Sequence, residues 1–351
     1  TMPRAYRPGT ALDCAAMLPD NVLRTAELPF VQSRSLPPPF TDRTVELWPL
    51  ELARLGACLR EVPPGARTCP LHAHVFEEEV FVVLLGTITV RELPDGAERY
   101  REYDLHPGDL VAYPPNTRLA HGSWNRADTP AVMLALSDDQ PGEICLYPDS
   151  GKTLLRGLGQ IGVHADDADR GELAALEHTA AARERADRRG VDRLADADRP
   201  THVVPAGSLR ERDCGTLFGR QLSRAAGARA VFVNQDRLPS GGVTSPAHWH
   251  TADEEIVFVL RGHPTLRQLV DGVELRTRLQ PGDAAHFAPG RRIAHQVLNE
   301  TDDDAVLLVI GTDDPQDVTV FPERDRVHVR GLGATAPFQP LAYWDGEAEN
   351  G

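Results

Sequence analysis

The amino-acid sequence contains one unit twice, and this repeat limits the fold more than any other feature. At an offset of 176 residues, the identical pairs are His72/His248, His74/His250, Glu79/Glu255, Gly86/Gly262, Thr89/Thr265, Arg91/Arg267 and Leu93/Leu269. After a two-residue difference in length, Pro107-Gly108-Asp109 matches Pro281-Gly282-Asp283, His121 matches His295 and Asn125 matches Asn299. Repeats of this kind are typical of duplicated structural units. The chain is therefore predicted to fold as two copies of one architecture.

Each copy is predicted to consist of short β-strands. The segments 79–93 and 255–269 are rich in apolar and β-branched residues, and one glycine interrupts each of them. An Asp-Gly pair, the strongest short hairpin signal, follows at 95–96 and 271–272. Many short strands with frequent turn signals favour an all-β barrel or sandwich over alternating strands and helices.

The repeat also sets the expected domain boundaries. We expect an N-terminal arm at 1–40, a first domain at 41–160, a linker at 161–204, a second domain at 205–335 and a C-terminal tail at 336–351. The arm contains "RSLPPPF" (34–40), an extended segment that is expected to pack on a partner barrel. In the linker, segment 171–190 is rich in alanine, arginine and acidic residues, and it favours a helix that ends at Gly190 ahead of solvated residues.

Composition argues against several classes of partner. The net charge of −15 repels polyanions, so neither nucleic acid nor an anionic membrane is expected as a partner. The sequence has no apolar run of about 18 residues, the length that a membrane span needs, and its first residues lack a secretory-signal pattern. Its five cysteines include no C-x-x-C pair, which fits a reducing compartment. We therefore expect a cytoplasmic protein.

Each copy carries two histidines two residues apart, with acidic residues shortly after them. Side chains at positions i and i+2 of a strand point to the same face, and one face of a small barrel is its interior. The pairs His72/His74 and His248/His250 would then each enter one cavity, and a carboxylate on the next strand can approach the same point. A third histidine, His121 or His295, lies on a later strand that could cross back. Three imidazoles and one carboxylate suit iron, manganese, nickel, cobalt or zinc.

These segments resemble the motifs of a known family. "HAHVFEEEVFVVLLG" (72–86) and "HWHTADEEIVFVLRG" (248–262) are similar to the first cupin motif, and "PGDLVAYPPNTRLAHGSWN" (107–125) and "PGDAAHFAPGRRIAHQVLN" (281–299) are similar to the second. The chain thus resembles a bicupin, with two tandem cupin barrels of the double-stranded β-helix or jelly-roll type and a short helical or disordered linker. The resemblance implies two metal-ligand sets: His72, His74, Glu79 and His121, and His248, His250, Glu255 and His295.

The ligand carboxylate has a close alternative in each copy, because acidic residues are consecutive there. Glu79 and Glu255 are favoured because each precedes a glycine by seven residues, as in the family. Glu78 and Glu254 remain the alternatives.

Candidates for substrate contacts rest on weaker signals. Arg91 and Arg267 hold equivalent positions, and an inward arginine would grip a substrate carboxylate, whereas an outward one would only solvate the sheet. Three aromatic residues are candidates for cavity walls: Tyr113, Phe287 and Trp124. His286 stands where the first copy has Ala112, so it either lines the second cavity or packs in the core.

The sequence has no separate nucleophile motif, phosphate loop or nucleotide fingerprint, so a metal must carry any reaction. The resemblance favours a dioxygenase-like oxygenase acting on a small organic molecule and O₂ in one or both barrels. Fe(II) is the favoured divalent metal, with Mn, Ni or Zn as alternatives. A non-redox isomerase, lyase or decarboxylase is the second expectation, and a binding or scaffold bicupin without catalysis is the third. Because cupin barrels commonly pair through their outer sheets, we expect either a homodimer or a monomer that mimics one.

Overall fold

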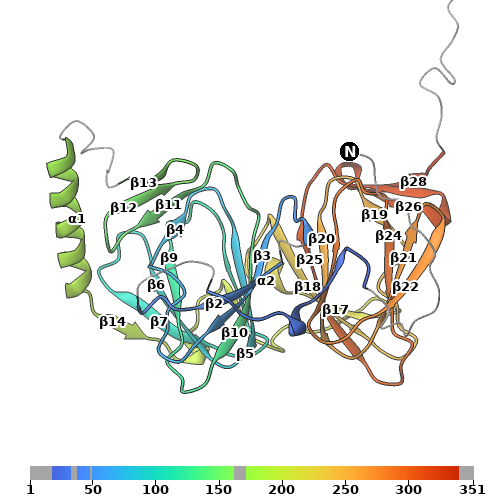
Figure 1. Ribbon diagram of the computed structural model, residues 1–351, viewed down its shortest axis with the longest axis horizontal. Helices are drawn as coiled ribbons and strands as arrows, with labels where there is room; N and C mark the ends of the chain where they lie inside the picture. Colours follow the sequence, from blue (N-terminus) through green and yellow to red (C-terminus); the bar gives the residue numbers. More distant parts are fainter. Residues whose placement is uncertain (1–17, 33–37, 48–49, 162–170, 340–351) are drawn as a thin grey trace, which may run out of the picture.

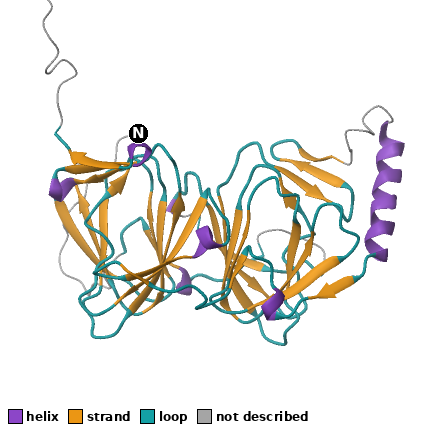
Figure 2. Cartoon of the chain, turned by 180° about the vertical axis from the view of Figure 1, so that it is seen from behind, coloured by secondary structure: helices purple, strands orange, loops and turns teal. Residues whose placement is uncertain are grey.

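The computed structural model describes residues 18–32, 38–47, 50–161 and 171–339, and these residues form two β-barrels side by side (Figure 1). The predicted all-β class is confirmed: in the described ranges the α-helices are α1 (Gly171–Arg188) in the linker and the short α2 (Leu222–Ala225). Helix α1 stands on the outer side of the first barrel, away from the second (Figure 2). No helix among the described residues has the length and apolar character needed to cross a membrane.

The first barrel consists of three sheets. A six-stranded sheet has the order β15-β8-β5-β10-β3-β2, and two four-stranded sheets have the orders β13-β12-β11-β4 and β14-β7-β6-β9. The strands of this half are β2 (Arg43–Glu46), β3 (Gly56–Val62), β4 (Ala73–His74), β5 (Glu79–Leu85), β6 (Ile88–Leu93), β7 (Tyr100–Leu105), β8 (Leu110–Tyr113), β9 (Ala120–Trp124), β10 (Ala131–Ser137), β11 (Ile144–Tyr147), β12 (Lys152–Leu155) and β13 (Gly159–Ile161). The linker adds β14 (Val191–Arg193) and β15 (Val203–Val204).

The second barrel repeats this plan. Its sheets have the orders β1-β23-β20-β25-β18-β17-β16, β22-β21-β24 and β19-β26-β27-β28. Its own strands are β16 (Arg212–Asp213), β17 (Phe218–Gln221), β18 (Val231–Leu238), β19 (Trp249–His250), β20 (Glu255–Arg261), β21 (Thr265–Val270), β22 (Val273–Arg278), β23 (Asp283–Phe287), β24 (Ala294–Leu298), β25 (Ala305–Thr312), β26 (Val318–Phe321), β27 (Arg326–Val329) and β28 (Ala334–Pro337). The strand β1 (Val22–Arg24) comes from the N-terminal arm.

The glycine that follows β5 or β20 shows why the repeated sequence gives the same turn twice. Gly86 has φ +73° and Gly262 has φ +83°, a conformation that side chains rarely adopt. A Cβ atom on Gly86 would lie 2.8 Å from the carbonyl oxygen of Pro130, and one on Gly262 would lie 2.8 Å from Cα of Ala305. Both backbones therefore need glycine to make the turn and to pack on the neighbouring strand.

The chain has a hydrophobic core inside each barrel and a further one between the barrels. The interior cores include Val62, Val83, Ile88 and Met133 in the first barrel and Leu238, Val257, Leu266 and Leu307 in the second. The core between the barrels joins Val80, Val82, Leu134 and Leu136 with Val231, Val233, Ile256 and Leu308. Alternate residues of β5 and β20 thus face either the barrel's own cavity or the other barrel.

Each barrel also gains an edge strand from the segment that precedes the other barrel in the sequence. The arm strand β1 pairs with β23 of the second barrel, and the linker strand β15 pairs with β8 of the first. Strand β1 thus pairs with the second barrel of the same chain. Most of the "RSLPPPF" segment lies outside the described residues, as do residues 340–351 of the expected tail.

Two glutamates connect the barrels reciprocally. The Glu78 carboxylate accepts hydrogen bonds from the backbone N–H groups of Arg229, Ala230 and Val231, at 2.8–3.1 Å. The Glu254 carboxylate accepts them from Ala53, Arg54 and Leu55, at 2.6–2.8 Å. These carboxylates, the alternative ligands in the sequence, therefore point across the interface and away from the cavities.

Candidate metal centres

In the first barrel, four side chains from three strands and one loop meet at one point. His72 precedes β4, His74 lies in β4, Glu79 begins β5 and His121 lies in β9. One donor atom from each of these residues lies within 4.8 Å of the others. Glu79 Oε2 is 3.1 Å from His74 Nε2 and 2.9 Å from His121 Nε2. Two backbone hydrogen bonds join His72 and His121, with N···O distances of 3.1 and 2.8 Å. They hold the residue before β4 in register with β9.

The Nδ1 atom of each imidazole in this cluster has a partner on the outer side. His72 Nδ1 is 2.9 Å from the Pro70 carbonyl oxygen, and His121 Nδ1 is 3.1 Å from that of Leu119. His74 Nδ1 is 3.1 Å from Glu143 Oε1. An imidazole that donates from Nδ1 presents the Nε2 lone pair to the cavity. The surrounding chain therefore selects the tautomer that a metal ligand needs.

The second barrel brings together the equivalent set. His248, His250 and Glu255 form a group of donor atoms within 4.8 Å of one another. His295 Nε2 lies 3.1 Å from Glu255 Oε1, and the ring centroids of His248 and His295 are 4.7 Å apart. His248 Nδ1 is 3.0 Å from the Pro246 carbonyl oxygen. This set is slightly more open, because His250 Nε2 is 3.5 Å from Glu255 Oε2.

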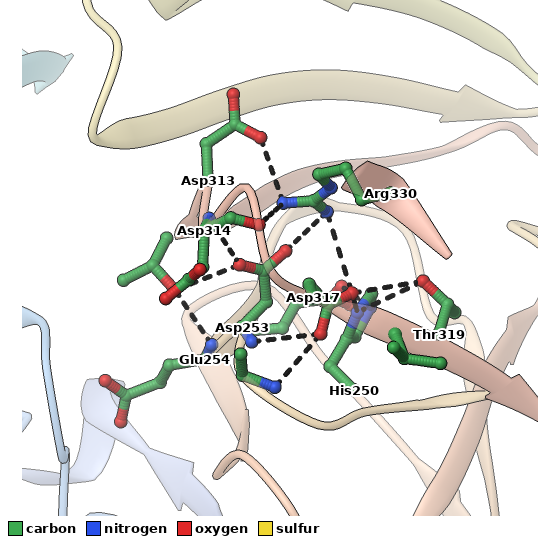
Figure 3. A network of polar contacts seen from close by, with 12 residues as sticks. His250, Asp253, Glu254, Asp313, Asp314, Asp317, Thr319 and Arg330 are labelled. Atoms are coloured by element: carbon green, nitrogen blue, oxygen red, sulfur yellow. Dashed lines mark hydrogen bonds and ion pairs between the residues drawn. The ribbon is translucent and has the colours of Figure 1, made fainter. Parts of the chain in front are cut away.

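A second carboxylate behind each site orients the second histidine, and the sequence motifs do not include it. In the second barrel Asp317 Oδ2 is 2.8 Å from His250 Nδ1, and Oδ1 accepts hydrogen bonds from the backbone N–H groups of Ala252 and Asp253 (Figure 3). Glu143 does the same for His74 and also accepts N–H groups from residues 75–77. The two acids match at the offset of 174, but they differ in type and lie beyond the second motif.

An arginine from the repeated "RGLG" segment completes each network. Arg330 Nη2 lies 2.5 Å from Asp253 Oδ2 and 3.8 Å from Asp317 Oδ2 (Figure 3). In the first barrel Arg156 Nη2 lies 2.5 Å from Glu77 Oε2. These arginines hold the loop between the second histidine and the ligand glutamate, which is the loop that sets the distance between them.

Two of the predicted wall residues pack on ligand imidazoles. Tyr113 stacks on His121 with ring centroids 3.6 Å apart and planes at 7°, and Phe287 stacks on His295 at 3.6 Å and 10°. The stacked ring prevents rotation of the imidazole, so the position at the end of β8 or β23 supports the ligand geometry. The structure therefore places both side chains directly beside the candidate centres.

The other predicted contact residues lie outside the cavities. Arg91 pairs with Glu102 at 2.6–2.7 Å and Arg267 with Glu274 and Glu323 at 2.6–2.9 Å, on the outer faces of their sheets. Trp124 stacks under Arg67 and Arg126 at 4.0 and 3.7 Å, also on the outside.

His286 is also outside. Its Nε2 lies 2.6 Å from Glu254 Oε1, on the interface face of β23, whereas its neighbours Ala285 and Phe287 face the barrel interior. Arg91 and Arg267 therefore point outward, and His286 packs at the interface between the barrels.

Charge is strongly coupled within both centres. Burial alone would raise the pKa of the Glu79 and Glu255 carboxyls, but the adjacent imidazoles hold each pKa well below its usual range. Burial and the neighbouring His295 lower the pKa of His248 to about 3. Burial opposes protonation of His250 too, but Asp317 and Glu255 raise its pKa to about 10. Without a metal, each carboxylate is thus stabilised by a proton on an imidazole, a role that a cation would take over.

The donor set fits a divalent transition metal. His74 Nε2 is buried and has no hydrogen-bond partner, although Glu79 Oε2 is only 3.1 Å away. A metal ion bound here would engage this nitrogen together with the Glu79 carboxylate. Three imidazole nitrogens and one carboxylate are ligands for iron, manganese, cobalt, nickel or zinc.

The walls around the two centres differ in chemistry. Cys69 Sγ lies 3.6 Å from His72 Nδ1, and Cys145 Sγ lies 3.7 Å from His74 Nδ1. At the matching positions of the second barrel, Ser245 Oγ lies 3.0 Å from His248 Nδ1 and Thr319 Oγ1 lies 3.5 Å from His250 Nδ1. Thiols therefore lie behind two imidazoles of the first centre, and hydroxyls lie behind the matching imidazoles of the second.

Comparison with known proteins gives a family and a fold. The model of the family described as "Cupin domain" matches residues 58–137 and 235–311, one match in each barrel. Among solved structures, the Lactobacillus farciminis oxalate decarboxylase formate complex has a TM-score of 0.57 at 15% identity, over 87% of this chain and 90% of that one. A point mutant of the Bacillus subtilis oxalate decarboxylase has a TM-score of 0.56 at 15% identity, over 87% and 80%. A search of curated proteins found no match. At this identity the structural likeness shows the fold.

Proposed function

Since the chain belongs to the cupin superfamily and carries two cupin domains in tandem, we propose that it is a metal-dependent enzyme acting on a small organic molecule. The observation that supports this most is the convergence of three imidazoles and one carboxylate in each barrel, with the Nδ1 atoms fixed from behind. A bound divalent metal would supply Lewis acidity and, if redox-active, electron exchange with substrate and O₂.

The protein's own groups have defined tasks in such a site. Glu143 and Asp317 hold the second histidine of each set, and Tyr113 and Phe287 clamp the third. This preorganisation keeps the donor atoms in place while a substrate binds. The buried surroundings exclude bulk water and strengthen every charge interaction inside the cavity.

Within this class, our first candidate reaction is that of an oxygenase. Four protein ligands leave about two positions on an octahedral ion, which suffice for a substrate and O₂ together. The second candidate is non-redox decarboxylase or lyase chemistry, which the fold shared with oxalate decarboxylases favours. The favoured metals are iron for the first reaction and manganese for the second.

The test is metal analysis of protein purified without chelator, followed by assays on protein loaded with Fe(II) or Mn(II). Oxygen uptake that needs both iron and an organic substrate would support the oxygenase. Carbon dioxide release without oxygen uptake would support the decarboxylase. If the protein holds no metal after reconstitution, both proposals are wrong and a scaffold role remains.

A further inference from the structure

A cavity of about 750 Å³ lies between helix α1 and the first barrel. One wall consists of residues from four strands, namely Ala73 of β4, Leu93 of β6, Ala120 of β9 and Leu146 of β11. The opposite wall includes Arg185 and Arg188 of α1 and Gly190 just after it. Helix α1 stands beside this barrel, and its C-terminal end leads into β14 (Figure 1). The cavity is therefore on the outside of the barrel, between a sheet and the linker helix.

Tyr100 of β7 fixes the end of α1 beside the sheet. Its backbone N–H donates a hydrogen bond to the Gly190 carbonyl oxygen at 2.9 Å. Its hydroxyl donates to Asp149 Oδ1 at 2.8 Å, and Arg189 Nη1 donates to the same oxygen at 2.8 Å. Strand β14, which follows the helix, pairs in parallel with β7. The helix and the sheet therefore keep a defined spacing, and the space between them belongs to the folded structure.

The floor of this cavity is apolar and faces away from the first candidate centre. Ala73, Leu93 and Ala120 belong to a small buried cluster that is distinct from the interior core of the barrel. Ala73 lies between His72 and His74, and side chains alternate along a strand, so Ala73 points to the opposite face. The floor thus offers apolar contacts on the outer side of the sheet, apart from the metal ligands.

Positive charge is concentrated around this floor. Six of the residues that line the cavity are basic and two are acidic, although the whole chain has a net charge of −15. The basic residues are Arg99, Arg118, Lys152, Arg185, Arg188 and Arg189. An excess of positive charge beside an apolar floor suits an organic anion.

Two of these cations are available to a ligand. The side chains of Lys152 and Arg185 form no hydrogen bond or ion pair within the part of the chain that the structure describes. Arg118 pairs with Asp95 at 3.6 Å, but both side chains are exposed and such a pair contributes little. The other three arginines are paired with carboxylates. Lys152 comes from β12 and Arg185 from α1, so the two available cations belong to opposite walls of the cavity.

The matching face of the second barrel has a different character. No α-helix covers it within the described ranges. Val273 and Leu275, which match Ala97 and Arg99 at the offset of 176, are exposed by 59% and 42%. The basic wall therefore comes from the linker helix and from positions that changed between the copies.

We propose that the cavity under α1 binds a small organic acid with an apolar body, whose carboxylate lies between Lys152 and Arg185. The apolar part of the ligand packs on the alanine and leucine floor. The site is separate from both candidate metal centres, so this inference goes beyond the proposed function and does not depend on a bound metal.

The test titrates metal-free protein with octanoate, octanol and inorganic phosphate. Lys152 is the only lysine of the chain, so reductive ¹³C-methylation labels one lysine side chain, retains its charge and lets NMR follow it. We expect octanoate to shift this signal to saturation. Octanol and phosphate should bind at least about tenfold more weakly, because octanol lacks the charge and phosphate lacks the apolar body.

Calorimetric titration of variants assigns the binding to this cavity. Arg185→Gln and Lys152→Gln should each weaken octanoate binding several-fold, whereas Lys152→Arg, which retains the charge, should keep most of the affinity. Arg183→Gln is the matched control, because Arg183 is exposed on the same helix and does not line the cavity. Thermal melting of every variant separates loss of binding from loss of folding.

The proposal is overturned if octanoate leaves the Lys152 signal unchanged, if phosphate binds as tightly as octanoate, or if Arg183→Gln weakens binding as much as Arg185→Gln. Octanoate binding that needs a loaded metal would also reject it, because the ligand would then belong to a metal centre. Octanoate binding to protein that never takes up metal would reject the proposed function and retain this inference.

Discussion

The two barrels have the same candidate metal ligands and differ in several of the groups around them. The first centre has Cys69, Cys145 and Arg60 nearby, where the second has Ser245, Thr319 and Asp236. A further buried acid, Glu92, bonds to Tyr103, Tyr113 and His202 in the first barrel, and Gln268 stands in its place in the second. The duplication thus retained the residues of the candidate metal centres and changed several of their neighbours. Each of the following predictions tests how independent the two halves are.

The largest effect is expected from removing a ligand. His72→Ala should abolish metal binding in the first barrel and leave the second loaded, and His248→Ala should do the opposite, because the donor sets share no residue. Metal analysis would show the content fall from two ions per chain to one. Arg267→Gln is the control, since that arginine lies on an outer face. Loss of half the metal from both barrels in either variant would contradict two independent sites.

A large loss of stability is expected at the reciprocal glutamates. Glu78→Ala should lower the free energy of unfolding by about 2–4 kcal/mol, because three backbone N–H groups, among them the buried one of Val231, lose a charged acceptor. Glu254→Ala should cost more, because His286 loses its partner as well. Urea unfolding of the metal-free protein measures both, with the exposed Glu98→Ala as control. Equal losses of unfolding free energy in the two variants would contradict the expected difference between the barrels.

A smaller effect on metal binding is expected from changing the carboxylates that orient the second histidines. Glu143→Gln and Asp317→Asn should each weaken metal binding in their own barrel by about 10–100-fold, because the second histidine loses the carboxylate that orients it. Competition with a chelator gives the affinities of the two sites. The opposite barrel in each variant serves as the internal control. Unchanged affinity in both variants would mean that backbone packing alone orients these rings.

The smallest effect is a pH-dependent one at Asp236. Because burial and Glu255 raise its folded pKa to about 6, above its ordinary value of 3.8, the protonated form favours folding and ionisation opposes it. The associated stability is present below about pH 4 and is lost as pH rises through 6. Asp236→Asn should therefore stabilise the metal-free protein, and its advantage should grow by about 1 kcal/mol between pH 5 and pH 7.5. Urea unfolding at both pH values measures this growth, and a constant difference would contradict it.

The sequence predicts the fold and both ligand sets because these features depend on local pattern. Strand alternation and the repeat place His72 with His74 and His248 with His250, and the structure brings each pair to its predicted carboxylate. The same alternation could have shown that Arg91 faces outward, since Val90 lies in the interior core. Asp317 could not be found in this way, because it lies 67 residues from His250 and only the folded barrel brings them together. The sequence shows that Arg60 and Asp236 hold equivalent positions and carry opposite charges. Only the structure shows that these faces of β3 and β18 point into the barrels.

The exchanged edge strands β1 and β15 have a consequence for the assembly of the chain. Two separate subunits that traded arms in this way would associate by a concentration-dependent equilibrium and would come apart on dilution. Joining the subunits covalently makes that association intramolecular, so it holds at any protein concentration. The covalent connection therefore keeps β1 and β15 paired with their barrels even when the protein is diluted.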